Sequence, residues 1–132
     1  MRLVACCLIG LWAISCQAWA QVPASERPAV DELVRKSNAG AAEGGFCAGL
    51  QWPVGTGDAY WAWLGKATTG ADKINKFRNG NCQYDRIEAV EMRDGRKCVR
   101  YTYFNCKAGA KCGVGKETEC QTAAGRWERD SK

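Results

Sequence analysis

The side chains in this sequence with the most chemical capacity are cysteines, carboxylates and aromatic rings, because histidine is absent. Its absence excludes Ser-His-Asp hydrolysis, histidine-activated cysteine nucleophiles, histidine-ligated zinc and histidine-based pH switching. Residues 113–117 resemble the end of a phosphate-binding loop, but Glu117 stands where that motif requires Ser or Thr. We therefore predict no catalytic residue, no cofactor and no metal site.

The first twenty residues predict a signal peptide. Arg2 precedes an apolar run of 13 residues, 3–15, and Ala18-Trp19-Ala20 has small residues where a signal peptidase reads them. A run this short cannot span a bilayer as a helix, which needs about 20 residues. We expect cleavage after Ala20, no transmembrane span, and an exported protein that is periplasmic or extracellular.

A lipoprotein is the alternative destination. Residues 13–16, Ala-Ile-Ser-Cys, resemble a bacterial lipobox, which would place a lipid anchor at Cys16, although Ala stands where Leu is usual. A retained amphipathic anchor is disfavoured, because no second cluster of charges flanks the apolar run.

Cleavage after Ala20 leaves an even number of cysteines in a short exported chain, which predicts three disulfides. The six are Cys47, Cys82, Cys98, Cys106, Cys112 and Cys120. No Cys-x-x-Cys pair occurs in the sequence, so a zinc site is disfavoured. Complete pairing would also leave no free thiol to act as a nucleophile.

The spacing of β-rich runs predicts one hairpin and one disulfide. Residues 84–92 and 97–105 flank the turn signal Asp94-Gly95. A two-residue turn competes with a three-residue loop in which Gly95 is left-handed. We favour the longer loop, because it sets opposite charges across the strands and places Cys82 directly opposite Cys106. We therefore predict a Cys82–Cys106 disulfide.

Strand geometry limits the remaining pairs. Cys98 and Cys106 lie eight residues apart on one strand, roughly 26 Å, whereas a disulfide needs Cα atoms within about 7 Å. With Cys82–Cys106 formed, the other four cysteines can pair in three ways. Of these we favour Cys112–Cys120 together with Cys47–Cys98.

The elements around this hairpin predict a small, disulfide-rich α+β fold. Ser25 as a cap and Pro28 at the start predict a short helix within residues 21–45. It is followed by Gly/Ala-rich chain that either docks weakly or acts as a tether. Residues 69–80 predict a second helix, and a third short strand is expected near residues 117–122. The expected architecture is two short helices with a central antiparallel β-hairpin or three-stranded sheet, in a disulfide-stapled domain over residues 46–132.

Aromatic residues gather between positions 52 and 63. Asp58 is a candidate cap for a short helical turn here, whereas a strand would align Trp61 with Trp63. Two interpretations remain for the tryptophans: they pack in the core, or they form an exposed aromatic shelf. The residues concerned are Trp52, Trp61, Trp63 and Trp127. We predict a binding surface from aromatic residues and nearby cations: Trp61, Trp63, Arg86, Lys97, Tyr101 and Tyr103.

Charge is spread unevenly along the chain. Residues 66–111 carry eleven basic and five acidic side chains, whereas the rest of the chain after residue 20 carries seven and nine. The excess of basic residues in this central segment favours an acidic partner. Ion pairs between neighbouring strands are the alternative explanation for these charges. Nucleic-acid binding is disfavoured, because neither a dense basic stripe nor a nucleic-acid-binding module is visible.

These patterns favour an exported, non-catalytic binding or inhibitory module that recognises an acidic protein or glycan partner. One alternative is a structural accessory of a cell-envelope or secretion assembly, with residues 21–45 as its tether. Another is a small exported enzyme that depends on a thiol or on carboxylates, for which Asp58, Asp72 and Asp85 are candidates.

Overall fold

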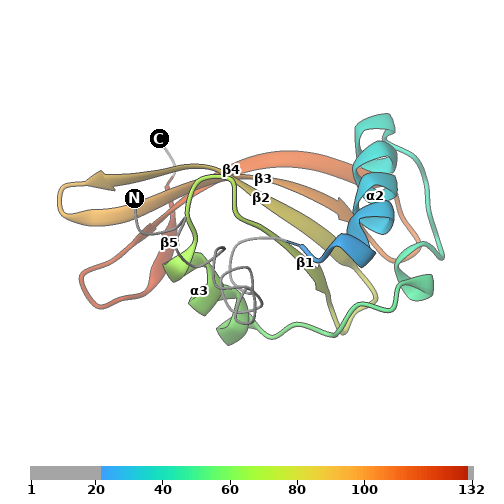
Figure 1. Ribbon diagram of the computed structural model, residues 1–132, viewed down its shortest axis with the longest axis horizontal. Coiled ribbons are helices and arrows are strands. Elements are labelled where there is room, and N and C mark those ends of the chain that lie inside the picture. The colour runs from blue at the N-terminus through green and yellow to red at the C-terminus, as the bar shows by residue number, and fades with distance from the viewer. Residues whose placement is uncertain (1–21, 131–132) are drawn as a thin grey trace, which may run out of the picture.

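A computed structural model describes residues 22–130 of the 132-residue chain (Figure 1). The predicted signal peptide, its cleavage after Ala20, and Cys16 lie outside the described residues. The elements are helices α2 (Arg27–Ala39) and α3 (Gly57–Lys66) and strands β1 (Asp72–Lys76), β2 (Cys82–Arg93), β3 (Arg96–Cys106), β4 (Cys112–Gln121) and β5 (Trp127–Arg129). The strands form one antiparallel sheet in the order β1-β2-β3-β4-β5. The small disulfide-rich α+β class is confirmed, with five strands rather than three.

Helix α2 forms within residues 21–45, as expected, but begins differently. Pro28 occupies its first turn, and Gly40 ends it in a left-handed conformation (φ 61°). A short 3-10 turn over Ala24–Glu26 precedes it, and no side chain caps it, so the expected Ser25 cap is wrong. Val30 and Leu33 are buried on its inner side and pack in one core with Cys82 and the strand aromatics.

The predicted helix over residues 69–80 is wrong, because β1 forms there. Ile74 lies opposite Tyr84 in β2, so this segment gains backbone hydrogen bonds from a neighbouring strand. Its apolar spacing was compatible with a helix, but tertiary pairing overrides such a local preference. The second helix is α3 instead, and Thr56 caps it rather than Asp58, because the Thr56 side chain accepts the Ala59 N–H at 3.2 Å.

The β2–β3 hairpin forms with a two-residue turn, so the predicted three-residue loop is wrong. Asp94 and Gly95 both have positive φ, 50° and 76°, as this tight turn type requires. The strand register nevertheless places Cys82 opposite Cys106, because β2 carries a bulge at Glu88. The extra residue that we placed in the loop therefore lies inside the strand.

Three disulfides form, as predicted, but they join different cysteines. The bonds are Cys47–Cys82, Cys98–Cys120 and Cys106–Cys112. The predicted Cys82–Cys106, Cys112–Cys120 and Cys47–Cys98 bonds are wrong. The reason is β4, which begins five residues earlier than the strand expected near 117–122 and pairs with β3 from Cys98 to Cys106. Its register sets Cys98 opposite Cys120 and Cys106 opposite Cys112.

The two helices cover opposite faces of the sheet at opposite ends (Figure 1). Side chains alternate between faces along a strand, so Tyr84 and Phe104 point to the face that α2 covers, which we call the α2 face. Ile87 and Tyr101 point to the other face, the α3 face, and pack with Trp63. Each helix leaves part of its face uncovered. No helix within residues 22–130 is both long enough and apolar enough to cross a membrane.

Candidate functional site: an aromatic surface above buried carboxylates

Helix α3 separates the two tryptophans that the sequence placed together. Residues two apart on a helix point about 200° away from each other. Trp63 is only 7% exposed and packs against the sheet, whereas Trp61 is 38% exposed and points outward. Of this pair, Trp61 alone is available to a ligand.

The Trp61 ring is held in place by other aromatic rings. It stacks on Trp127 with 6.5 Å between ring centroids and 12° between planes, and Tyr60 contacts it edge-on at 5.0 Å. Strand β5 brings Trp127 here by pairing with the end of β4, where Trp127 lies opposite Gln121. Positions 61 and 127 are far apart in the sequence, and no local pattern indicates that they are in contact. Trp127 is therefore absent from the binding residues predicted from the sequence.

Two hollows open on either side of Trp61. The first has a volume of about 280 Å³ and is lined by Thr56, Gly57, Tyr60, Trp61, Phe77, Gln83 and Tyr101. The second has a volume of about 370 Å³ and is lined by Trp61, Gly125, Arg126 and Trp127. An exposed aromatic ring between two hollows offers a flat apolar surface with polar groups at its edges, a common design for small-ligand sites.

Beside the first hollow, β2 carries a fully buried carboxyl group. Asp85 is 0% exposed, and burial raises its pKa to about 7. Two amides oppose that shift by donating hydrogen bonds: Gln83 Nε2 to Oδ1 at 2.6 Å, and Asn75 Nδ2 to Oδ2 at 3.3 Å. Gln83 also lines the hollow, so it connects the buried acid to the surface.

Further acids lie across the sheet on the α3 face. The Tyr101 hydroxyl donates to Glu117 Oε2 at 3.0 Å, and Arg129 pairs with the other Glu117 oxygen at 2.8 Å. Glu119 is 8% exposed, and its Oε2 has no hydrogen-bond partner within residues 22–130. Burial and then the charge of Glu117 raise the pKa of Glu119. The α3 face thus combines aromatic rings with groups able to accept hydrogen bonds.

Tyr103 lies farther along β3, next to Tyr101 on the α3 face, with 6.5 Å between ring centroids. Its ring lies directly over Gly115 of β4. A Cβ atom at position 115 would fall 2.2 Å from the Tyr103 hydroxyl, so only glycine leaves room for the ring. No sequence pattern indicates this contact, because it depends on the β3–β4 register.

The two predicted basic residues do not join the aromatic surface. Arg86 points to the α2 face, where its Nε lies 3.1 Å from Glu88 Oε1. Lys97 lies at the end of α3, where its ammonium group donates to the backbone oxygens of Leu64, Gly65 and Ala67 at 3.4, 2.7 and 3.1 Å. Among the six predicted binding residues, Trp61 is exposed and Tyr103 is partly buried on the same α3 face. Tyr101 lines the first hollow but is buried, with only 4% of the residue exposed.

Because Lys97 satisfies the last carbonyls of α3, Lys97→Met is expected to destabilise the protein by about 1–2 kcal/mol. Methionine keeps the aliphatic chain but removes the donors and the positive charge at the negative end of the helix dipole. Urea unfolding followed by circular dichroism measures the loss. Lys107→Met, at an exposed position, is the control, and an equal loss in both variants would contradict this role for Lys97.

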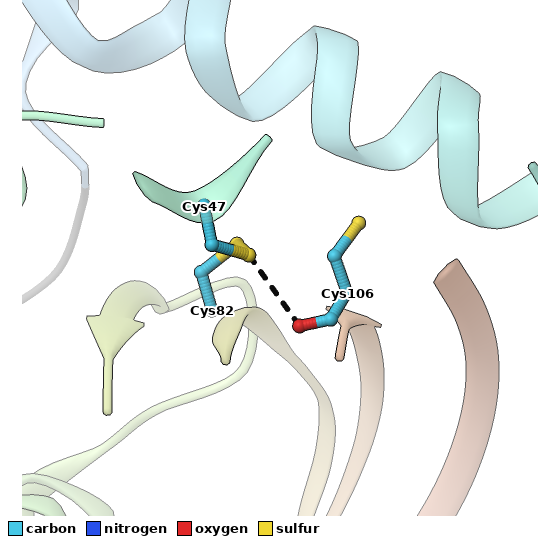
Figure 2. Close-up of side chains that lie close together, drawn as sticks. All are labelled: Cys47, Cys82 and Cys106. Atoms are coloured by element: carbon cyan, nitrogen blue, oxygen red, sulfur yellow. Dashed lines mark hydrogen bonds between the residues drawn. A yellow bond between two sulfur atoms is a disulfide. The ribbon is translucent and has the colours of Figure 1, made fainter. Parts of the chain in front are cut away.

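Within residues 22–130, one group of three potential metal ligands comes together. The sulfur atoms of Cys47, Cys82 and Cys106 lie within 4.8 Å of one another, and Figure 2 shows the Cys47–Cys82 bond facing Cys106. The Cys47 sulfur lies 3.4 Å from the Cys106 carbonyl oxygen. A metal requires thiolates, whereas all three sulfurs here are in disulfides. The cluster stabilises the fold, since it joins the segment before α3 to the sheet.

No family model, curated protein or solved structure matches this chain. Its function is therefore argued from the geometry of the site.

Proposed function

We propose that this protein is an exported, non-catalytic binding module that recognises a glycan at Trp61. The observation that carries the proposal is the Trp61 ring, 38% exposed, stacked on Trp127 and flanked by two hollows. A sugar ring has a face of C–H groups that packs on an aromatic ring, and an edge of hydroxyl groups that need hydrogen-bond partners. Gln83 in the first hollow and Arg126 in the second supply such partners.

The rigidity of the site supports binding. Three disulfides fix the framework, and the Trp127 and Tyr60 rings hold Trp61 before a ligand arrives. A preorganised surface loses little conformational entropy on association, which leaves more of the contact energy for affinity. Tryptophan and tyrosine are also the residues that most often dominate binding energy at interfaces. Disulfides of this kind are compatible with an exported protein.

The burial of Asp85 and Glu119 favours binding over glycoside hydrolysis. Such hydrolysis needs two carboxyl groups that reach the scissile bond, but Asp85 and Glu119 are 0% and 8% exposed. Asp72 is occupied structurally, because it accepts hydrogen bonds from the Val22 N–H, from Arg27 and from the Tyr84 hydroxyl. A thiol mechanism is disfavoured, because the six cysteines described are all paired.

Trp61→Ala is expected to weaken glycan binding by at least tenfold without changing the fold, because Trp61 is exposed and supplies the stacking surface. The probes are soluble oligosaccharides of glucose, N-acetylglucosamine and uronic acids, with affinity measured by calorimetry and by quenching of tryptophan fluorescence. Circular dichroism and thermal unfolding verify the fold.

Met92→Ala is the matched control, since Met92 is 69% exposed and lies outside the residues that line the two hollows. It should leave affinity unchanged. No binding of any oligosaccharide by the parent protein, or equal binding by the Trp61→Ala variant, would overturn the proposal.

A further inference from the structure

The uncovered part of the α2 face is basic. Arg86 in β2 and Lys116 in β4 both lie level with Thr102 of β3, so the two cations flank one residue of the central strand. Arg100 lies two residues before Thr102 on β3 and therefore points to the same face. All three basic side chains are exposed. Three adjacent strands thus present their cations side by side.

These cations line a continuous groove. One hollow, of about 650 Å³, runs from Val34 and Asn38 of α2 across Arg86 and Phe104. A second, of about 210 Å³, continues towards Arg129 and Asp130. Arg100 and Lys116 line both hollows, which makes the two hollows parts of one groove. Helix α2 forms its wall at one end.

The carboxylates in this groove already have partners. Glu88 accepts hydrogen bonds from Arg86 at 3.1 Å and from the Thr102 hydroxyl at 2.8 Å. Asp130 pairs with Arg93 at 2.6 Å. The Glu117 carboxylate points away to the α3 face, where it pairs with Arg129 at 2.8 Å.

Arg100 and Lys116 differ from these paired groups. Within residues 22–130, neither comes within 4.0 Å of a carboxylate oxygen. The Thr102 hydroxyl and Arg86 lower the pKa of Glu88, and the more distant charge of Lys116 adds to this effect. Arg100 and Lys116, which line both hollows, are thus cations without a direct ion pair in the described part of the chain, and an anionic ligand would meet complementary charge there.

The groove also has an apolar end, which narrows the class of partner. Val114 is 49% exposed and lines the groove beside Val34 of α2 and Phe104 of β3. A polyanionic glycan or polyphosphate has no aliphatic side chain to cover this surface, whereas a polypeptide can place an acidic residue and an apolar residue next to each other.

We propose that this groove binds an extended acidic segment of a partner protein, with carboxylates on Arg100 and Lys116 and an apolar side chain on Val114. It lies on the opposite face of the sheet from Trp61, so it is a second site, independent of the glycan site. Both ligands can bind at once, and the protein would then connect a glycan to an acidic protein.

The test uses a fluorescein-labelled twelve-residue peptide of Glu and Asp with two central Leu residues, measured by fluorescence anisotropy at low salt. Arg100→Gln/Lys116→Gln should weaken binding at least tenfold, and Val114→Ser should weaken it severalfold. Arg78→Gln/Lys107→Gln removes the same charge from exposed positions outside the groove and should change binding less than twofold. Added salt should weaken binding by the parent protein, because it screens exposed charges.

Two comparisons make the test decisive. A peptide with Gln and Asn in place of Glu and Asp should not bind. Equal binding of the two peptides would overturn the proposal. Equal losses of peptide affinity in the groove variant and in the control variant would overturn it as well. Heparin or anionic phospholipid vesicles that bind through Arg100 and Lys116 more tightly than the peptide would overturn the choice of a protein partner. Trp61→Ala should leave peptide affinity unchanged, so failure of the glycan proposal stays distinguishable from failure of this one.

Discussion

Raising the pH from about 4 to about 8 is expected to lower the free energy of unfolding by roughly 4 kcal/mol through Asp85 alone. Burial raises the pKa of Asp85 from 3.8 to about 7 in the folded protein. Between these two values the folded chain binds the proton and the unfolded chain does not, so stability falls as the pH rises. Each unit between the two pKa values is worth about 1.4 kcal/mol, and the loss is complete above the folded-state pKa.

Urea unfolding across this pH range, for the parent protein and for Asp85→Asn, measures the effect. Asparagine cannot ionise, so the variant should lose most of the fall in stability between about pH 4 and pH 7. Asp58→Asn, at an exposed position on α3, should keep the parent's pH dependence. Parallel stability curves for the parent and Asp85→Asn would contradict the assignment of a raised pKa to this group.

Removing the Cys47–Cys82 disulfide is expected to cost about 4 kcal/mol, and removing Cys106–Cys112 about 2 kcal/mol. The first bond joins residues separated by 35 positions, and the second joins residues separated by 6. A longer closed loop restricts the unfolded chain more, so its disulfide contributes more stability. The longer loop also contains α3 and Trp61, which the bond ties to β2.

The two double variants, Cys47→Ala/Cys82→Ala and Cys106→Ala/Cys112→Ala, are matched controls for each other. All four cysteines are buried, so the cost of lost packing is similar in both and the difference reports loop length. Urea midpoints under oxidising conditions measure the ranking. Equal or reversed midpoints would show that strain or residual structure in the unfolded chain outweighs loop closure.

The hairpin shows how far local sequence information reaches. The β-rich runs and the turn signal at Asp94-Gly95 correctly predicted two neighbouring antiparallel strands. The same information could not distinguish an extra residue in the loop from one at Glu88 inside the strand, because both leave Cys82 opposite Cys106. A bulge depends on how the sheet curves and packs, and no local pattern marks it.

The candidate site depended still more on tertiary contacts. The density of aromatic residues drew attention to Trp61 and Trp63 alike. Helix α3 decides their exposure, because it leaves Trp61 38% exposed and packs Trp63 into the core. Trp127 reaches Trp61 only because β5 folds back on β4. Arg86 is separated from the aromatic residues by the sheet itself, since its position on β2 points it to the α2 face.

The sequence by itself determined the fold class, the number of disulfides, the first helix and the central hairpin. Each of these follows from residues close together in the chain or from the parity of the cysteine count. Only the tertiary structure decided which cysteines pair, that residues 72–76 form a strand, and which aromatic rings and cations share a surface. Those outcomes depend on strand register and on the face to which each side chain points. A shift of one residue reverses that face, and contacts between distant segments set the register.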